Sequence, residues 1–187
     1  MMRNQSLLVM FFFITFTGFL AACVTTAKYK PVSNLVTLEV SFADPLWDGR
    51  GIPEGQQCHA FGGNGATPRL IVKNIPSGTN AIIMEYSDRS WPQMDDGGHG
   101  KIGYRIPLGT TEITIPSVPG HTFDLPKGFF LLEAHRSLRG NGGAYKPPCS
   151  GGRGHLYYVT VKAVYDASSK SEESKLLGKA KKELGIY

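Results

Sequence analysis

Hydrophobic and polar residues alternate along two stretches of the chain, with the period of two that is typical of half-buried strands. In the first, Val36, Leu38, Val40 and Phe42 are separated by threonine, glutamate and serine. In the second, tyrosine, valine and alanine occupy every second position from residue 157 to 165. We therefore predict strands over both stretches.

Shorter apolar runs predict further strands. They cover residues 70–72, 81–86, 102–106 and 112–115. A further apolar run at 129–132 is too short to show whether it is a strand or a buried helix. Proline and glycine at 74–79 predict a turn, and the stretch 44–65 is rich in glycine, proline and polar residues, which predicts a long loop.

The end of the chain shows a different pattern. Leu176, Leu177, Ala180 and Leu184 fall at helical spacing with lysines between them, and Gly185 stands where a helix would end. We predict a C-terminal helix. Many short strands with glycine and proline turns favour a mainly β fold, a sandwich with a few short helices besides this one.

The N-terminus indicates export. A basic start is followed by an apolar run over residues 7–20 that is too short for a confident membrane span. The run ends in Leu20-Ala21-Ala22-Cys23, which resembles a bacterial lipobox. We predict a lipoprotein signal peptide over 1–22, a lipidated cysteine and tether over 23–34, and one domain over 35–187. An ordinary signal peptide with a chance cysteine is the alternative.

A lipid on Cys23 would place the protein in the bacterial cell envelope. Each buried methylene of an acyl chain contributes about 0.8 kcal/mol, so two or three chains hold a protein stably on a membrane. We expect palmitate-type acylation and a domain on the periplasmic face. Val24 follows the cysteine where an aspartate often retains lipoproteins in the inner membrane, so the outer membrane is favoured.

Composition narrows the function further. The net charge is +5, yet no basic run is interleaved with aromatic residues, so we expect no nucleic-acid partner. The sequence shows no nucleophile elbow, phosphate-binding loop or zinc-protease motif, and its five histidines lack metal-ligand spacing. We therefore expect no cofactor, no metal and no enzymatic activity. With Cys23 lipidated, Cys58 and Cys149 remain as an even pair in an oxidising compartment.

One segment is more specific than the rest. In residues 144–161 a proline- and glycine-rich loop leads to His155, and a strand follows at once. The segment resembles the signature loop of the phosphatidylethanolamine-binding protein family, which includes the Raf kinase inhibitor protein and bacterial homologues. Blocks at 52–70, 74–79 and 86–92 resemble the family in the same order. The resemblance implies the family's β-sandwich from about residue 42 to the end.

The resemblance also implies a site. In this family an aspartate, two histidines and a tyrosine line a small pocket for the phosphate of a lipid head group or of a phosphorylated residue. The matching positions are Asp88, His155 and Tyr157, with His99 matched after a shift of one residue. A histidine and a phenol both donate hydrogen bonds to phosphate oxygens, and a carboxylate orients an imidazole.

The family blocks place Cys58 and Cys149 on either side of this pocket, which implies a disulfide between them. Two positions depart from the family pattern. Ser90 replaces a second aspartate and Leu156 replaces an arginine, so a salt bridge that would brace the pocket loops is expected to be missing. Trp91 is interpreted as a packing residue.

These features predict an envelope-tethered lipoprotein that binds a small anionic ligand of the phosphate type or an inhibited partner protein, which the sequence does not identify. Two alternatives remain. One is a hydrolase with a histidine-centred site, although no activated nucleophile is recognisable in the sequence. The other is a structural envelope protein whose pocket is vestigial.

Overall fold

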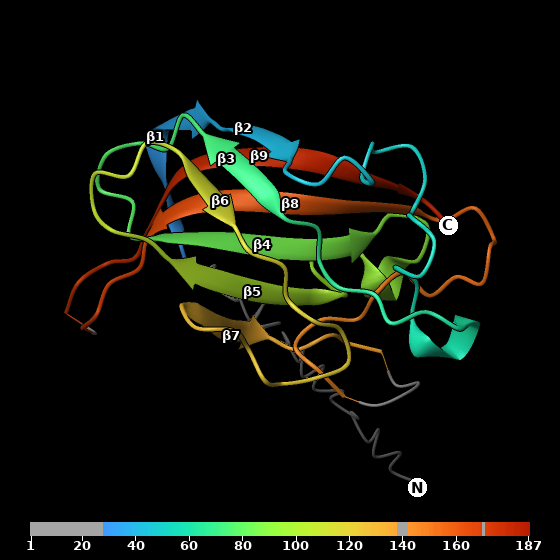
Figure 1. Cartoon of the computed structure of the whole chain (residues 1–187). Helices are drawn as coiled ribbons and strands as arrows, with labels where there is room; N and C mark the ends of the chain where they lie inside the picture. Colours follow the sequence, from blue (N-terminus) through green and yellow to red (C-terminus); the bar gives the residue numbers. More distant parts are fainter. Residues whose placement is uncertain (1–27, 138–141, 170) are drawn as a thin grey trace, which may run out of the picture.

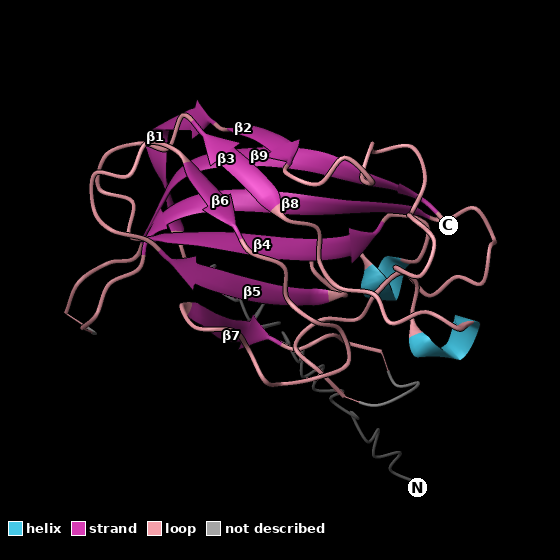
Figure 2. Cartoon of the chain, viewed as in Figure 1, coloured by secondary structure: helices cyan, strands magenta, loops and turns pink. Residues whose placement is uncertain are grey.

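Two β-sheets stack to form the fold (Figure 1). The computed structural model describes residues 28–137, 142–169 and 171–187, so the predicted signal peptide and Cys23 lie outside the described residues. The larger sheet has six strands in the order β1-β9-β8-β4-β5-β7, and the smaller has three in the order β2-β3-β6. Helical structure among the described residues is limited to two short 3₁₀ turns (Figure 2).

The strands are β1 (Lys30–Thr37), β2 (Glu39–Phe42), β3 (Leu70–Lys73), β4 (Ala81–Asp88), β5 (Gly100–Arg105), β6 (Ile113–Ile115), β7 (Phe129–Glu133), β8 (Leu156–Tyr165) and β9 (Lys175–Ile186). The 3₁₀ turns are η1 (His59–Phe61) and η2 (Pro92–Met94). The prediction of a mainly β sandwich with a few short helices is confirmed, and the apolar run at 129–132 is a strand.

The main core lies between the two sheets. In the central pair, β4 and β8 run antiparallel, and Met84 lies directly opposite Val161. Alternate side chains of both strands point inward and meet the apolar face of β3, where Leu70 and Val72 are fully buried. This alternation is the period of two that the sequence showed for β8.

β4 is buried on both faces, which explains why its sequence is a continuous apolar run rather than an alternating one. Ala81 and Ile83 point away from the sandwich core into a second cluster with Tyr29 and Val164. Tyr29 also donates a hydrogen bond to Asp166. The chain is therefore already part of the domain at Tyr29, upstream of the predicted boundary at residue 35.

The predicted C-terminal helix is wrong. Residues 175–186 form β9, which pairs antiparallel with β8 and parallel with β1. The register between β8 and β9 shifts at two places, and each shift moves the following side chains to the other face. Leu176 consequently joins the second cluster while Leu184 joins the main core. Because of these two bulges, the apolar residues of β9 do not keep the strand's period of two, and their spacing in the sequence resembles that of a helix.

Two other boundaries differ from the sequence prediction. Residues 30–34, expected in the tether, are the first part of β1. The strand predicted over 36–42 is divided at Leu38, because β1 joins the larger sheet through β9 while β2 joins the smaller one through β3. One continuous alternating stretch therefore supplies strands to both layers.

Candidate functional site

A cavity of about 790 Å³ lies at the end of the larger sheet where β4 finishes and β8 begins. The turns η1 and η2 lie at this same end, on the right in Figure 1. The four residues that the sequence predicted for a ligand site all line this one cavity. They are Asp88, His99, His155 and Tyr157.

His155 and Asp88 form a close pair. His155 Nδ1 lies 2.6 Å from Asp88 Oδ2, and the two side chains are 15% and 5% exposed. The backbone of His155 is fixed by two hydrogen bonds with Tyr187, the last residue of the chain. A carboxylate at Nδ1 holds the proton there and leaves Nε2 for a ligand. Asp88 therefore orients the imidazole.

Hydrogen bonds of Arg89 and Ser90 join the loop after β4 to the start of β8. Ser90 Oγ accepts a hydrogen bond from the backbone N–H of Leu156 at 3.2 Å, and the Arg89 N–H donates to the Leu156 carbonyl at 2.9 Å. The N–H of Ser90 also donates to Asp88 Oδ1 at 2.9 Å. The two residues that depart from the family pattern thus join the loop after β4 to the start of β8, as a salt bridge would.

Tyr157 lies opposite Asp88 in the β4–β8 register and is 2% exposed. Its hydroxyl oxygen accepts a hydrogen bond from the Cys149 N–H at 3.1 Å. Burial raises the pKa of Tyr157 to about 12, so the phenol keeps its proton at neutral pH. The hydroxyl therefore keeps a proton that Asp88 or a bound anion can accept.

His99 stands between β4 and the loop before β8. Its ring meets the ring of Tyr157 edge-on, with centroids 5.3 Å apart, and its Nδ1 lies 2.7 Å from the Lys146 carbonyl oxygen. Burial lowers the pKa of His99 to about 4, so the imidazole is neutral at pH 7. The carbonyl accepts the Nδ1 proton, and Nε2 is therefore an acceptor.

Residues 144–150, which we call the central segment, join the walls of the cavity. The N–H of Lys146 donates to the His99 carbonyl at 2.9 Å, and the His121 N–H donates to the Tyr145 carbonyl at 3.0 Å. Cys149 is disulfide-bonded to Cys58, with Cα atoms 5.2 Å apart. The predicted disulfide is confirmed, and it attaches η1 to the central segment.

The close approach of the central segment depends on a glycine. Gly100 has φ +123°, and a Cβ built on it would lie 2.1 Å from the Ala144 carbonyl oxygen. Glycine is the residue that adopts this conformation without strain and leaves that space empty. The glycine directly after His99 thus allows the histidine and the central segment to lie side by side.

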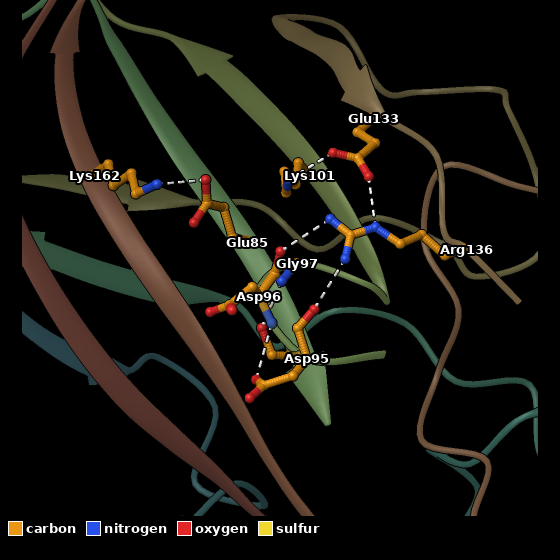
Figure 3. A network of polar contacts seen from close by, with 9 residues as sticks. Glu85, Asp95, Asp96, Gly97, Lys101, Glu133, Arg136 and Lys162 are labelled. Carbon is orange, nitrogen blue, oxygen red and sulfur yellow. Dashed lines mark hydrogen bonds and ion pairs between the residues drawn. The ribbon is translucent and has the colours of Figure 1, made fainter. Parts of the chain in front are cut away.

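Arg136 holds another part of the wall (Figure 3). Its Nε donates to Glu133 Oε1 at 2.7 Å, and its two terminal nitrogens donate to the carbonyls of Asp95 and Asp96 at 3.3 Å. Glu133 also accepts a hydrogen bond from Lys101 at 2.5 Å. This network fastens the turn after η2 to β7.

Sequence reasoning missed several residues of the cavity. Besides Arg136, the lining includes His59, His121, Lys146 and Arg153. These residues are far apart in the sequence and share no spacing, so no local signal could have grouped them. Among the described residues that line the cavity, Asp88 is the acidic one, whereas Arg136, Lys146 and Arg153 are basic.

The interpretation of Trp91 as a packing residue is wrong. Its side chain is 44% exposed, it lines the cavity, and its ring centroid lies 6.3 Å from that of His155. The proline that follows it begins η2, which turns the chain at this point. Trp91 therefore stands at the mouth beside the Asp88–His155 pair.

Two further searches of the described residues concern metals and membranes. Within residues 28–137, 142–169 and 171–187, no group of three histidine, cysteine, aspartate or glutamate side chains could hold a metal ion. No helix in that part of the chain is long and apolar enough to cross a membrane.

Comparison with known proteins gives structural similarity alone. No model of a known protein family matches the chain, and no curated protein matches it. A solved structure from Chlamydia trachomatis, described as a putative phosphatidylethanolamine-binding protein homologue, is similar over 81% of this chain and 97% of its own, with 17% identity and a TM-score of 0.47.

A second similar structure is YbcL of E. coli, described as a new member of the mammalian PEBP family. The similarity covers 81% of this chain and 100% of that one, with 19% identity and a TM-score of 0.47. The function proposed below rests on the residues of the cavity rather than on these two similarities.

Removing the disulfide should destabilise the domain. The bond closes a loop across 91 positions, for which the chain-entropy relation gives at most about 4.6 kcal/mol. We predict that the double variant Cys58→Ser, Cys149→Ser loses about 2 to 4 kcal/mol of unfolding free energy, measured in urea. Reduced wild-type protein is the control and should match the variant. Equal stability of the oxidised wild type and the variant would contradict the prediction.

His99 should make the fold sensitive to acid. Because its folded pKa of about 4 lies below the value of about 6.5 in an unfolded chain, the unfolded state takes up this proton first as the pH falls. Stability is therefore lost between pH 6.5 and pH 4. We predict that His99→Gln reduces the loss between pH 7 and pH 4.5 by about 2 to 3 kcal/mol.

Urea unfolding at both pH values measures this difference, with Lys73→Ala, which lies outside the lining of the cavity, as the control. An unchanged acid dependence in His99→Gln would contradict the prediction, because it would mean that His99 has the same pKa in the folded and the unfolded protein.

Proposed function

We propose that the domain is a binding module whose cavity takes a small anionic ligand of the phosphate type, held by His155 and Tyr157. The observation that supports this most is the Asp88–His155 pair at 2.6 Å beside a buried phenol. Asp88 engages Nδ1 of His155, which leaves Nε2 as the ring atom that can contact the ligand. Tyr157, which lies two residues after His155 on β8, offers a hydroxyl proton.

The surroundings favour an anion over a cation. Lys146 is 6% exposed, and its side chain donates to Ser137 Oγ at 2.6 Å within the lining. Arg153 lies in the glycine-rich loop just before His155 and also lines the cavity. The positive charges raise the local concentration of anions, and the one acidic side chain is engaged with His155.

The affinity of an isolated phosphate should be modest. A hydrogen bond to a charged group is worth about 1.5 to 3 kcal/mol net. Two such bonds, less the cost of immobilising the ligand, correspond to dissociation constants in the micromolar to millimolar range.

We predict that wild-type protein binds phosphate and phosphoethanolamine in this range and that His155→Ala weakens binding at least about tenfold. Calorimetric titration at pH 6 measures both. Lys73→Ala is the control, because it removes a cation that pairs with Glu112 on the smaller sheet. Equal binding by wild type and His155→Ala would refute the assignment of the site. Absence of binding by wild type would favour a vestigial cavity.

A hydrolase is the second candidate, because a carboxylate holding Nδ1 of a histidine is also how a general base is oriented. Ser150 lines the same cavity, but its hydroxyl donates to the Tyr187 carbonyl at 2.5 Å rather than to His155. Ester hydrolysis that disappears in both His155→Ala and Ser150→Ala would favour this candidate over the binding module.

The domain is further proposed to be tethered in the bacterial envelope through lipid on Cys23, on the basis of the lipobox-like sequence. We predict that the protein enters the detergent phase and incorporates labelled palmitate, and that Cys23→Ser abolishes both. The control is Cys58→Ser, which removes a different cysteine. Palmitate labelling that persists in Cys23→Ser would contradict the tether.

A further inference from the structure

The cavity is larger than a phosphate needs. Its volume of about 790 Å³ lies within the range of sites for whole small molecules, about 300 to 1,000 Å³. The residues of the proposed phosphate site, Asp88, His155 and Tyr157, occupy one part of it. The remaining lining includes two histidines that the proposed function does not use, His59 and His121.

These two histidines are stacked on each other. Their ring centroids lie 4.1 Å apart at an interplanar angle of 21°. His59 is attached to the central segment through the neighbouring disulfide, and His121 through its backbone hydrogen bond to Tyr145. Both rings are therefore held in place by the same segment that positions His99.

The hydrogen bonds of the stacked rings indicate where their protons lie. His121 Nε2 lies 3.4 Å from the backbone N–H of His59 and accepts it, so the neutral ring has its proton on Nδ1. His59 Nε2 lies 2.9 Å from Asn64 Oδ1 and donates to it. One N–H of His121 thus remains for a ligand, and protonation of His59 would add a second.

The groups around this pair are basic. His59, Lys146 and His135 are the charged groups that act on His121, and each disfavours its protonation. Two imidazolium rings in stacked contact also repel each other. An anion bound against the pair would reduce this repulsion. Asp88 is the negative group that lies beside His155 in the same cavity.

We propose that His59, His121 and Lys146 form a second anion subsite. The ligand of this cavity then has two anionic groups, and the protein takes up a proton when the ligand binds. His99 and Tyr157, both uncharged at neutral pH, line the same cavity and would contact the uncharged part of the ligand. The proposal rests on the proposed function for the first subsite and specifies the class of ligand.

The proton is taken up for a simple reason. Burial, followed by the neighbouring basic groups, lowers the pKa of His121 in the free protein, so the ring is mainly neutral at pH 7. A bound anion favours the imidazolium and raises that pKa, and the added proton goes to Nε2 in exchange for the long 3.4 Å hydrogen bond from the His59 N–H. Affinity for a ligand with two anionic groups should therefore increase as the pH falls towards 6.

The test compares two ligands that differ by one anionic group, glycerol 3-phosphate and 3-phosphoglycerate. We predict that wild-type protein at pH 6.5 binds 3-phosphoglycerate about tenfold more tightly, the effect of one added hydrogen bond to a charged group. Calorimetry in two buffers of different ionisation enthalpy should show uptake of a proton with 3-phosphoglycerate that exceeds the uptake with glycerol 3-phosphate.

The variant His121→Asn removes the imidazole and suits the backbone, because His121 has φ +59° and asparagine tolerates that conformation. We predict that it binds the two ligands within about twofold of each other and loses the additional proton uptake, with glycerol 3-phosphate affinity unchanged. His59→Gln should reduce the preference in the same direction, and Lys73→Ala should leave it unchanged. Thermal unfolding of each variant shows whether it is folded.

An unchanged preference for 3-phosphoglycerate in a folded His121→Asn would overturn the second subsite, as would a wild type that does not distinguish the ligands. Failure of the proposed phosphate site has a different result. In that case wild type does not bind glycerol 3-phosphate, and any binding of 3-phosphoglycerate that His121→Asn abolishes would support the second subsite alone.

Discussion

The attachment of the central segment, residues 144–150, to three separate parts of the chain is the constraint on which the site depends. Backbone hydrogen bonds attach it to His99 and His121, and the Cys58–Cys149 disulfide attaches it to η1. The space for it exists because Gly100 has no side chain. A loop between strands thereby becomes a fixed wall, and residues that are distant in sequence gather around one cavity.

Electrostatics follows from this arrangement. At one part of the cavity the Asp88 carboxylate lies 2.6 Å from Nδ1 of His155. At the other part His59 and His121 are stacked beside Lys146, and the groups acting on His121 are all basic. Buried His99 lines the same cavity as a neutral ring. The central segment thus supports one histidine that is paired with a carboxylate and a second pair of histidines on which basic groups act.

Local patterns predicted the sandwich, and the family resemblance supplied the four residues that line the cavity. A strand following a proline- and glycine-rich loop located His155, and the family blocks located Asp88. The stacked histidines could not be predicted, since His59 and His121 are brought together by the disulfide and by backbone hydrogen bonds. The strand β9 was mistaken for a helix because two shifts of register, which the partner strand determines, disguise its period.

The central claim is that the cavity binds an anion through His155. Imidazole proton and nitrogen resonances of the intact protein test it most directly, because they report the protonation of each histidine separately. The account predicts that added phosphate shifts the Nε2 and ring proton signals of His155, while His99 keeps its proton on Nδ1 alone. Unchanged His155 signals at saturating phosphate would contradict the account.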